Sequence, residues 1–138
     1  MTLSLLINID VDDLARAEAF YCGALGLKPA RRFGDDGVEL EGANAPIYLL
    51  RKPAGSRAGD AVDGTRDYGR HWTPVHIDVV VVDLDAALKR AEAAGAAREG
   101  DVRTAAWGRI ALLADPFGHG FCLIEFLNRG YDEIATRG

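Results

Sequence analysis

His76 and Glu125 are the two side chains that the sequence marks most clearly for chemistry. His76 stands near the start of the segment TPVHIDVVVV, and Glu125 interrupts the apolar segment FCLIEF. Burial of a carboxylate without a partner is costly, so Glu125 requires a cation, a hydrogen-bond donor or solvent. A carboxylate in an apolar strand can also serve as a general base. We therefore take Glu125 as the candidate general base and His76 as a candidate functional residue.

Each of these residues also has a purely structural interpretation. A histidine near a strand start can be a hydrogen-bonded core residue, and Glu125 could pair with a nearby arginine such as Arg109. His119 lies in the turn DPFGH, where a surface turn residue is the ordinary expectation. The sequence alone leaves these alternatives open.

Other side chains could bind a small organic molecule. Aromatic rings supply a large contact area at low entropic cost, and a few polar groups among apolar ones suit a ligand pocket. The candidate ligand-binding residues are Asn8, Tyr48, Tyr68, Trp72, Asp78 and Phe121.

Two copies of one strand–helix unit must position these groups. The clearer copy has a strand at 75–82, with His76 and Asp78 on one face and alternating apolar residues on the other. Asp83 can cap the helix that follows it, 84–94. The weaker copy has a strand at 3–11, a helix capped by Asp12 or Asp13, and the same Asp-Leu pair at an offset of seventy.

Three further strands follow each helix, which gives the order βαβββ twice. This duplication predicts an α+β fold of two modules that pack together, because neither copy alone would bury its sheet well. We expect the further strands at 28–34, 37–41, 47–51, within 97–104, at 108–113 and at 120–127. We expect one domain, 1–138, made of a first module (1–52), a loop or lid (53–72), a second module (73–128) and a polar tail (129–138).

Composition narrows the possible partners and surroundings. A net charge of −5 argues against nucleic-acid binding, which usually requires a basic face. The apolar runs are too short to span a bilayer, and Leu3–Ile9 lacks the basic flank of a signal peptide, so we expect no membrane partner. Cys22 and Cys122 lie far apart and form no CxxC motif, which favours reduced structural thiols in a cytoplasmic protein.

Several motifs resemble the vicinal-oxygen-chelate superfamily of glyoxalase I, bleomycin-resistance proteins and extradiol dioxygenases. They are the junction DLDAAL, the triplet Trp107-Gly108-Arg109 and the segment DPFGHGFCLIEF, together with DLARAEAFYCGALGL in the first module. The resemblance implies curled mixed sheets that form an incompletely closed barrel around a ligand cup, and a homodimer. It also implies metal ligands on the first and last strands of a module, which match His76 and Glu125. The matching positions of the first module are Leu6 and either Leu50 or Tyr48.

Three functions follow as expectations. The first is a binding protein that holds a small, partly apolar molecule in the cup without a full metal site or other cofactor. The second is a lyase, isomerase or dioxygenase with Zn, Ni, Fe or Mn on the reduced ligand set of His76 and Glu125. For extradiol cleavage, His71 or His119 would have to supply the missing histidine ligand. The third is metal-free catalysis with Glu125 or His76 as the base. The sequence leaves open whether the protein is an enzyme.

Overall fold

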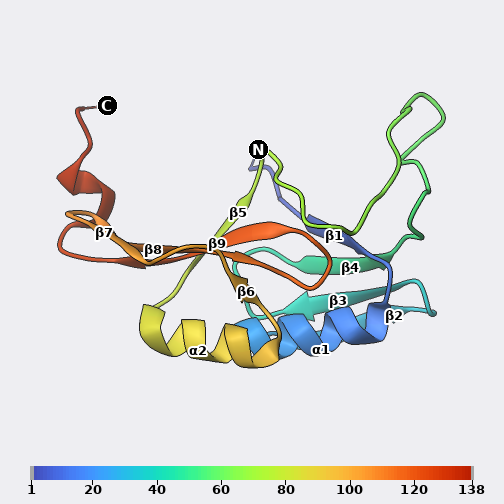
Figure 1. Ribbon diagram of the computed structural model, residues 1–138, viewed down its shortest axis with the longest axis horizontal. Coiled ribbons are helices and arrows are strands. Elements are labelled where there is room, and N and C mark those ends of the chain that lie inside the picture. The colour runs from blue at the N-terminus through green and yellow to red at the C-terminus, as the bar shows by residue number, and fades with distance from the viewer. Residues whose placement is uncertain (1, 138) are drawn as a thin grey trace.

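The computed structural model describes residues 2–137 and contains the predicted βαβββ module twice (Figure 1). The first module forms a four-stranded mixed sheet in the order β1-β4-β3-β2, in which β1 and β4 run parallel. Its elements are β1 (Ile7–Val11), α1 (Leu14–Leu25), β2 (Lys28–Phe33), β3 (Gly37–Glu41) and β4 (Ile47–Arg51).

The second module repeats this order, with its expected irregular strand divided into two short pieces. The sheet order is β5-β9-β8-β6, β7 also pairs with β8, and β5 runs parallel to β9. Its elements are β5 (Ile77–Val80), α2 (Leu84–Ala94), β6 (Ala97–Arg98), β7 (Arg103–Ala105), β8 (Gly108–Ala114) and β9 (Gly120–Phe126), followed by a 3-10 turn at Gly130–Glu133.

Both helices begin and end with the same residue types. The Asp13 carboxylate accepts a hydrogen bond from the Arg16 backbone N–H at 3.1 Å, and Asp83 accepts one from Ala86 at 3.1 Å. A cap of this kind satisfies a backbone N–H that the helix itself leaves free. Gly26 and Gly95 end the helices in the left-handed conformation, as their sequence positions predict.

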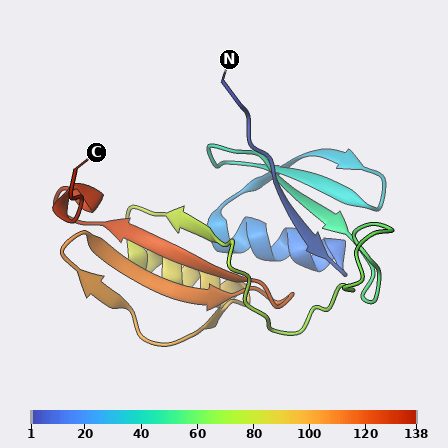
Figure 2. The same cartoon turned by 90° about the horizontal axis from the view of Figure 1, so that it is seen from above.

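The two helices lie on the same side of the two sheets and pack end to end (Figures 1 and 2). The contact is close, because a Cβ added to Gly23 would lie 3.3 Å from the Cβ of Ala94. One apolar core includes side chains from both modules, among them Phe20, Leu49, Leu84 and Leu123. The two sheets do not close into a barrel, and together these features confirm the predicted α+β architecture.

The segment between the modules crosses the molecule and lies against the turn that joins β8 to β9 (Figure 2). The His71 backbone N–H donates to the Gly118 carbonyl at 3.0 Å. A Cβ at Gly118 would lie 2.1 Å from the Gly69 carbonyl oxygen, so glycine is needed there for the two segments to touch. Tyr68 anchors the start of this strap (residues 68–73) by donating its hydroxyl proton to the Lys52 carbonyl at 2.6 Å. Among residues 2–137, no helix is both long and apolar enough to cross a membrane.

Candidate functional site

Strand register decides which side chains share a face with His76. In the parallel pairing of β5 with β9, Asp78 lies opposite Cys122 and Ile77 lies opposite Phe121. Phe121 and Leu123 point into the core beneath the sheet, whereas Cys122 lies on the other face. We call this second face, which points away from the helices, the cup face. Cys122 therefore takes the place near His76 and Asp78 that the sequence assigned to Glu125.

Glu125 lies on the helix side of its sheet and binds the start of α2. Its Oε1 accepts a hydrogen bond from the Leu84 backbone N–H at 2.8 Å. A carboxylate at a helix N-terminus is favourable, because free N–H groups and the positive end of the helix dipole meet there. The expected pairing of Glu125 with His76 is not formed, and Arg109 binds Asp85 at 2.9 Å rather than Glu125.

On the cup face of the second module lie His76, Asp78 and Cys122, which we call the thiol cluster. One imidazole nitrogen, one carboxylate oxygen and the thiol sulfur all lie within 4.8 Å of one another, and His76 Nε2 is 3.4 Å from Asp78 Oδ1. Burial, and then the charge of Asp78, raise the pKa of the Cys122 thiol to about 11. The Trp72 ring covers His76, with the ring centres 4.8 Å apart.

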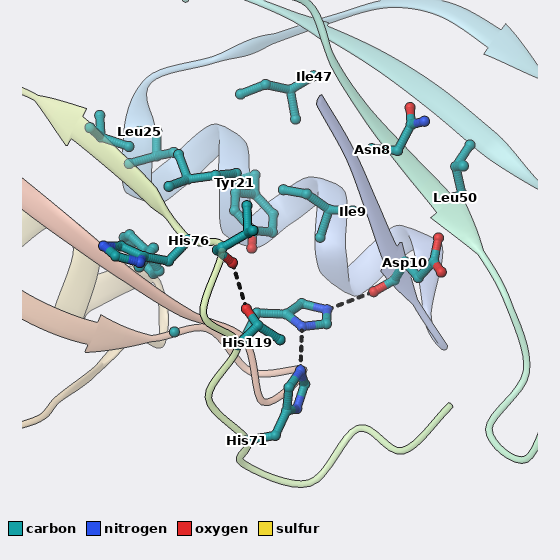
Figure 3. A pocket seen from close by; sticks show the side chains of 16 residues that line it. Asn8, Ile9, Asp10, Tyr21, Leu25, Ile47, Leu50, His71, His76 and His119 are labelled. Carbon is teal, nitrogen blue, oxygen red and sulfur yellow. Dashed lines mark hydrogen bonds between the residues drawn. The ribbon is translucent and has the colours of Figure 1, made fainter. Parts of the chain in front are cut away.

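A pocket of about 520 Å³ opens between β1 and β5, and α1 lies behind it (Figure 3). All three histidines of the chain line it, although they come from the strap, from the residue just before β5 and from the turn before β9. Most of the other lining groups are apolar. The lining includes Ile9, Leu25, Ile47, Ile77, Val79 and Phe121.

The predicted ligand-binding residues divide between this pocket and other places. Asn8 and Phe121 line the pocket. Asp78 belongs to the thiol cluster, and Trp72 covers the imidazole of that cluster. Tyr48 lies on the cup face of the first module, and Tyr68 anchors the strap.

His119 lines the pocket and connects three parts of the chain. Its Nε2 lies 2.7 Å from the Asp10 carbonyl oxygen on β1, and its Nδ1 lies 3.3 Å from His71 Nε2 on the strap (Figure 3). The Asp115 carboxylate shapes the turn by accepting the backbone N–H groups of Phe117 and His119 at 2.8 and 2.9 Å. The motif DPFGH signalled this turn, but it did not show that the imidazole reaches the first module.

Asp115 also links the turn to the first helix. Its second carboxylate oxygen accepts the hydroxyl proton of Tyr21 from α1, and both groups are buried. Burial, followed by the charge of Asp115, raises the pKa of Tyr21 well above its usual value. This contact fixes the first module against the turn that carries His119, and the sequence did not indicate it.

The cup face of the first module has a different set of groups. Glu39 on β3 accepts hydrogen bonds from the Arg31 guanidinium at 2.7 and 2.9 Å and from the Tyr48 hydroxyl at 2.7 Å. These bonds lower the pKa of the Glu39 carboxyl to about 2. Leu6 precedes β1 and is exposed, and Leu50 lies opposite Asp10. The first module therefore carries a self-contained ion pair where the second carries the thiol cluster.

The chain matches known proteins over nearly its whole length. Residues 6–124 match the family model described as a glyoxalase-like domain. The chain is 32% identical over 136 residues to the anthracycline biosynthesis protein DnrV of Streptomyces peucetius, covering 94% of this chain but only 43% of that protein. It is 34% identical over 121 residues to a protein of Mycobacterium bovis, covering 84% of this chain and 78% of that one.

Solved structures show the same fold at lower sequence identity. The fosfomycin resistance protein FosX of Listeria monocytogenes, in a mutant complexed with Mn(II) and dihydroxypropylphosphonic acid, aligns with a TM-score of 0.74 at 19% identity. That alignment covers 98% of this chain and 100% of the other. A lactoylglutathione lyase of Agrobacterium tumefaciens aligns with a TM-score of 0.61 at 19% identity, covering 91% and 96%. The chain belongs to the glyoxalase-like family of the vicinal-oxygen-chelate superfamily.

Proposed function

We propose that the protein binds a small, partly apolar organic molecule in the pocket between its two modules. The supporting observation is the pocket itself, whose volume of about 520 Å³ lies within the range of small-molecule sites. Its apolar wall would hold the body of the ligand. Asn8, Thr73 and the imidazoles would orient the polar groups, since few polar groups in an apolar pocket give orientation and specificity.

Two opposite residues of β5 provide a matched test. Val79 lines the pocket, whereas Val80 points to the cup face and is 59% exposed. A panel of small organic molecules is screened by thermal shift, and hits are titrated into Val79→Phe and Val80→Phe. Loss of binding in Val79→Phe alone supports the pocket. A panel without hits, or loss in Val80→Phe alone, contradicts the proposal.

A second candidate function is metal-dependent catalysis on the cup face of the second module. His76, Asp78 and Cys122 offer one nitrogen, one oxygen and one sulfur donor, and three protein ligands with an open position are typical of catalytic zinc. The sulfur donor fits zinc better than manganese or magnesium, because thiolate is a soft ligand. Zinc held there would polarise an oxygen atom of a substrate. The carboxylate oxygen of Asp78 that does not bind zinc would still be able to accept a proton or a hydrogen bond.

Elemental analysis tests this second candidate. Purified protein loaded with Zn²⁺ and desalted should retain at least about one equivalent if three ligands converge. Cys122→Ala and His76→Ala should each lose about one equivalent relative to the unmodified protein, since each removes a ligand of the cluster. Retention that does not change in either variant removes the cluster from consideration as a metal site.

We also propose that two copies of the chain associate. Within residues 2–137, β1 and β5 are edge strands, and Leu5, Leu6 and Val75 beside them are exposed. Open strand edges with apolar flanks favour pairing with another chain. Light scattering after size exclusion should give twice the monomer mass, and a monomer across the accessible concentrations contradicts the association.

A further inference from the structure

His71 and His119 approach each other through one ring nitrogen each. His71 Nε2 lies 3.3 Å from His119 Nδ1. The other nitrogen of each ring faces a backbone carbonyl: His71 Nδ1 lies 2.9 Å from Gly69 O, and His119 Nε2 lies 2.7 Å from Asp10 O. Figure 3 shows the two rings one above the other at the pocket wall.

The carbonyl contacts fix the protonation of the outer nitrogens. A carbonyl oxygen can only accept a hydrogen bond, so the outer nitrogen of each ring must carry the proton. In two neutral imidazoles, the inner nitrogens then both carry lone pairs. Two lone pairs do not attract each other, and an electron-poor atom placed between them would stabilise the arrangement.

The distances fit a metal ion in this place. Two imidazole nitrogens bound to one tetrahedral zinc at about 2.0–2.1 Å lie about 3.3 Å apart, with ring centres about 5.2 Å apart. The observed values are 3.3 Å between the nitrogens and 5.1 Å between the ring centres. A straight N–H···N hydrogen bond with the same nitrogen separation would place the ring centres farther apart, at about 5.6 Å. The observed ring separation is therefore closer to the value for two ligands of one zinc ion than to the value for a straight hydrogen bond.

The surroundings also suit a cation. Metal-binding histidines generally donate their other N–H to a carbonyl or carboxylate, as both rings do here. The Asp10 and Asp115 carboxylates lie on the segments that contact His119, and Asp67 directly precedes the strap. The nearby cations Arg66 and Arg70 are bound to Asp10 at 2.8 Å and to Glu99 at 2.6 Å.

We propose that His71 and His119 form a two-imidazole site for a borderline-soft divalent cation such as Zn²⁺. Both histidines also line the pocket between the modules, from which further ligands of the ion would come. This site is separate from the cluster around Cys122, because it uses the strap and the β8–β9 turn rather than the cup face. It requires no organic ligand, so it stands or falls independently of small-molecule binding.

The test uses zinc alone. ZnCl₂ is titrated into the Cys122→Ser protein, in which the thiol of the other cluster is absent, and binding is followed by calorimetry and by imidazole ¹⁵N NMR. We expect about one equivalent of zinc to bind, with the shifts centred on His71 Nε2 and His119 Nδ1. Adding His71→Ala should weaken binding at least about tenfold, because a ligand is lost. Since His71 lies on the strap, circular dichroism should show an intact fold in that variant.

Leu50→Ala in the same Cys122→Ser background is the matched control, because Leu50 also lines the pocket but has no group that could bind a metal. Zinc affinity should be unchanged in this variant. The proposal is overturned if zinc binding survives His71→Ala, if the ¹⁵N shifts centre on His76 instead of the pair, or if the inner nitrogens share a proton that zinc does not displace.

Discussion

The two modules share a backbone plan but carry opposite chemistry on their cup faces. On the first module, Asn8, Tyr48 and Glu39 lie side by side across β1, β4 and β3. The equivalent positions of the second module, across β5, β9 and β8, hold Asp78, Cys122 and Leu112. The acidic group therefore lies on an inner strand in the first module and on an edge strand in the second, and a thiol occupies the position of the tyrosine.

This difference determines which module has donors left for a ligand. Arg31 and Tyr48 already bind Glu39, so the charge of the first cup is satisfied within the module. The second cup places a thiol and a carboxylate together beside His76, and the carboxylate raises the pKa of the thiol. A cation would reverse that effect, because a metal ion favours the thiolate. Duplication therefore conserved the scaffold while the chemistry of the two copies diverged.

The largest expected effect tests whether the modules are one cooperative unit. Leu49 and Leu123 occupy equivalent strand positions and are both 0% exposed. Replacing either by alanine should lower the free energy of unfolding by about 2–5 kcal/mol. Because both contribute to one core, each variant should shift the whole urea transition, measured by far-UV circular dichroism and by tryptophan fluorescence. Both tryptophans, Trp72 and Trp107, lie outside the first module, so an unchanged fluorescence transition in Leu49→Ala would show that the modules unfold separately.

A smaller effect is expected at the link between α1 and the β8–β9 turn. Asp115→Ala leaves the Tyr21 hydroxyl and two backbone N–H groups without their acceptor, which should lower the free energy of unfolding by about 1–3 kcal/mol. Tyr21→Phe removes the inter-module bond but keeps the turn, so its loss should be smaller. Chemical denaturation measures both, and an equal loss would show that the turn bonds contribute nothing.

The helix caps test the role of Glu125. Asp13→Ala should lower the free energy of unfolding by about 1 kcal/mol. Asp83→Ala should cost less, because Glu125 still accepts a bond at the start of α2. In Asp83→Ala combined with Glu125→Ala, the loss should exceed the sum of the single losses. Strict additivity in this double-mutant cycle would show that the two carboxylates act independently.

The smallest change is expected at the ion pair of Glu39 and Arg31 in the first module, and it depends on pH. The carboxyl pKa of Glu39 is lowered to about 2 in the folded protein. An unfolded glutamate has a pKa of about 4.3. A lowered pKa stabilises the fold above pH 4.3, and this contribution is lost as the pH falls through 2.

Wild type should therefore exceed Glu39→Gln in stability at neutral pH, and the difference should shrink as the pH falls from about 4.3 towards 2. Arg31 is largely solvent-exposed, so screening keeps the effect small. Glu41→Gln, an exposed carboxylate on the same strand, is the control. A difference that stays constant over this range would contradict the assignment.

Much of the fold could be predicted from the chain alone because its signals are local. The Asp-Leu caps, the glycines that end each helix and the period-2 strands depend only on neighbouring residues. Their recurrence at an offset of seventy positions indicated the duplication. The alternation in β9 also showed that Cys122 and Glu125 point to opposite faces.

The site required the tertiary structure, because it depends on how distant segments meet. The sequences of β5 and β9 do not determine how the two strands are aligned. A shift of one residue in this alignment exchanges the faces on which their side chains meet. That register put Cys122, not Glu125, beside His76. The path of the strap brought His71 to His119, and the packing of α1 against the turn brought Asp10 to the same point. The sequence determined the two modules, whereas their pairing and packing decided which side chains could act together.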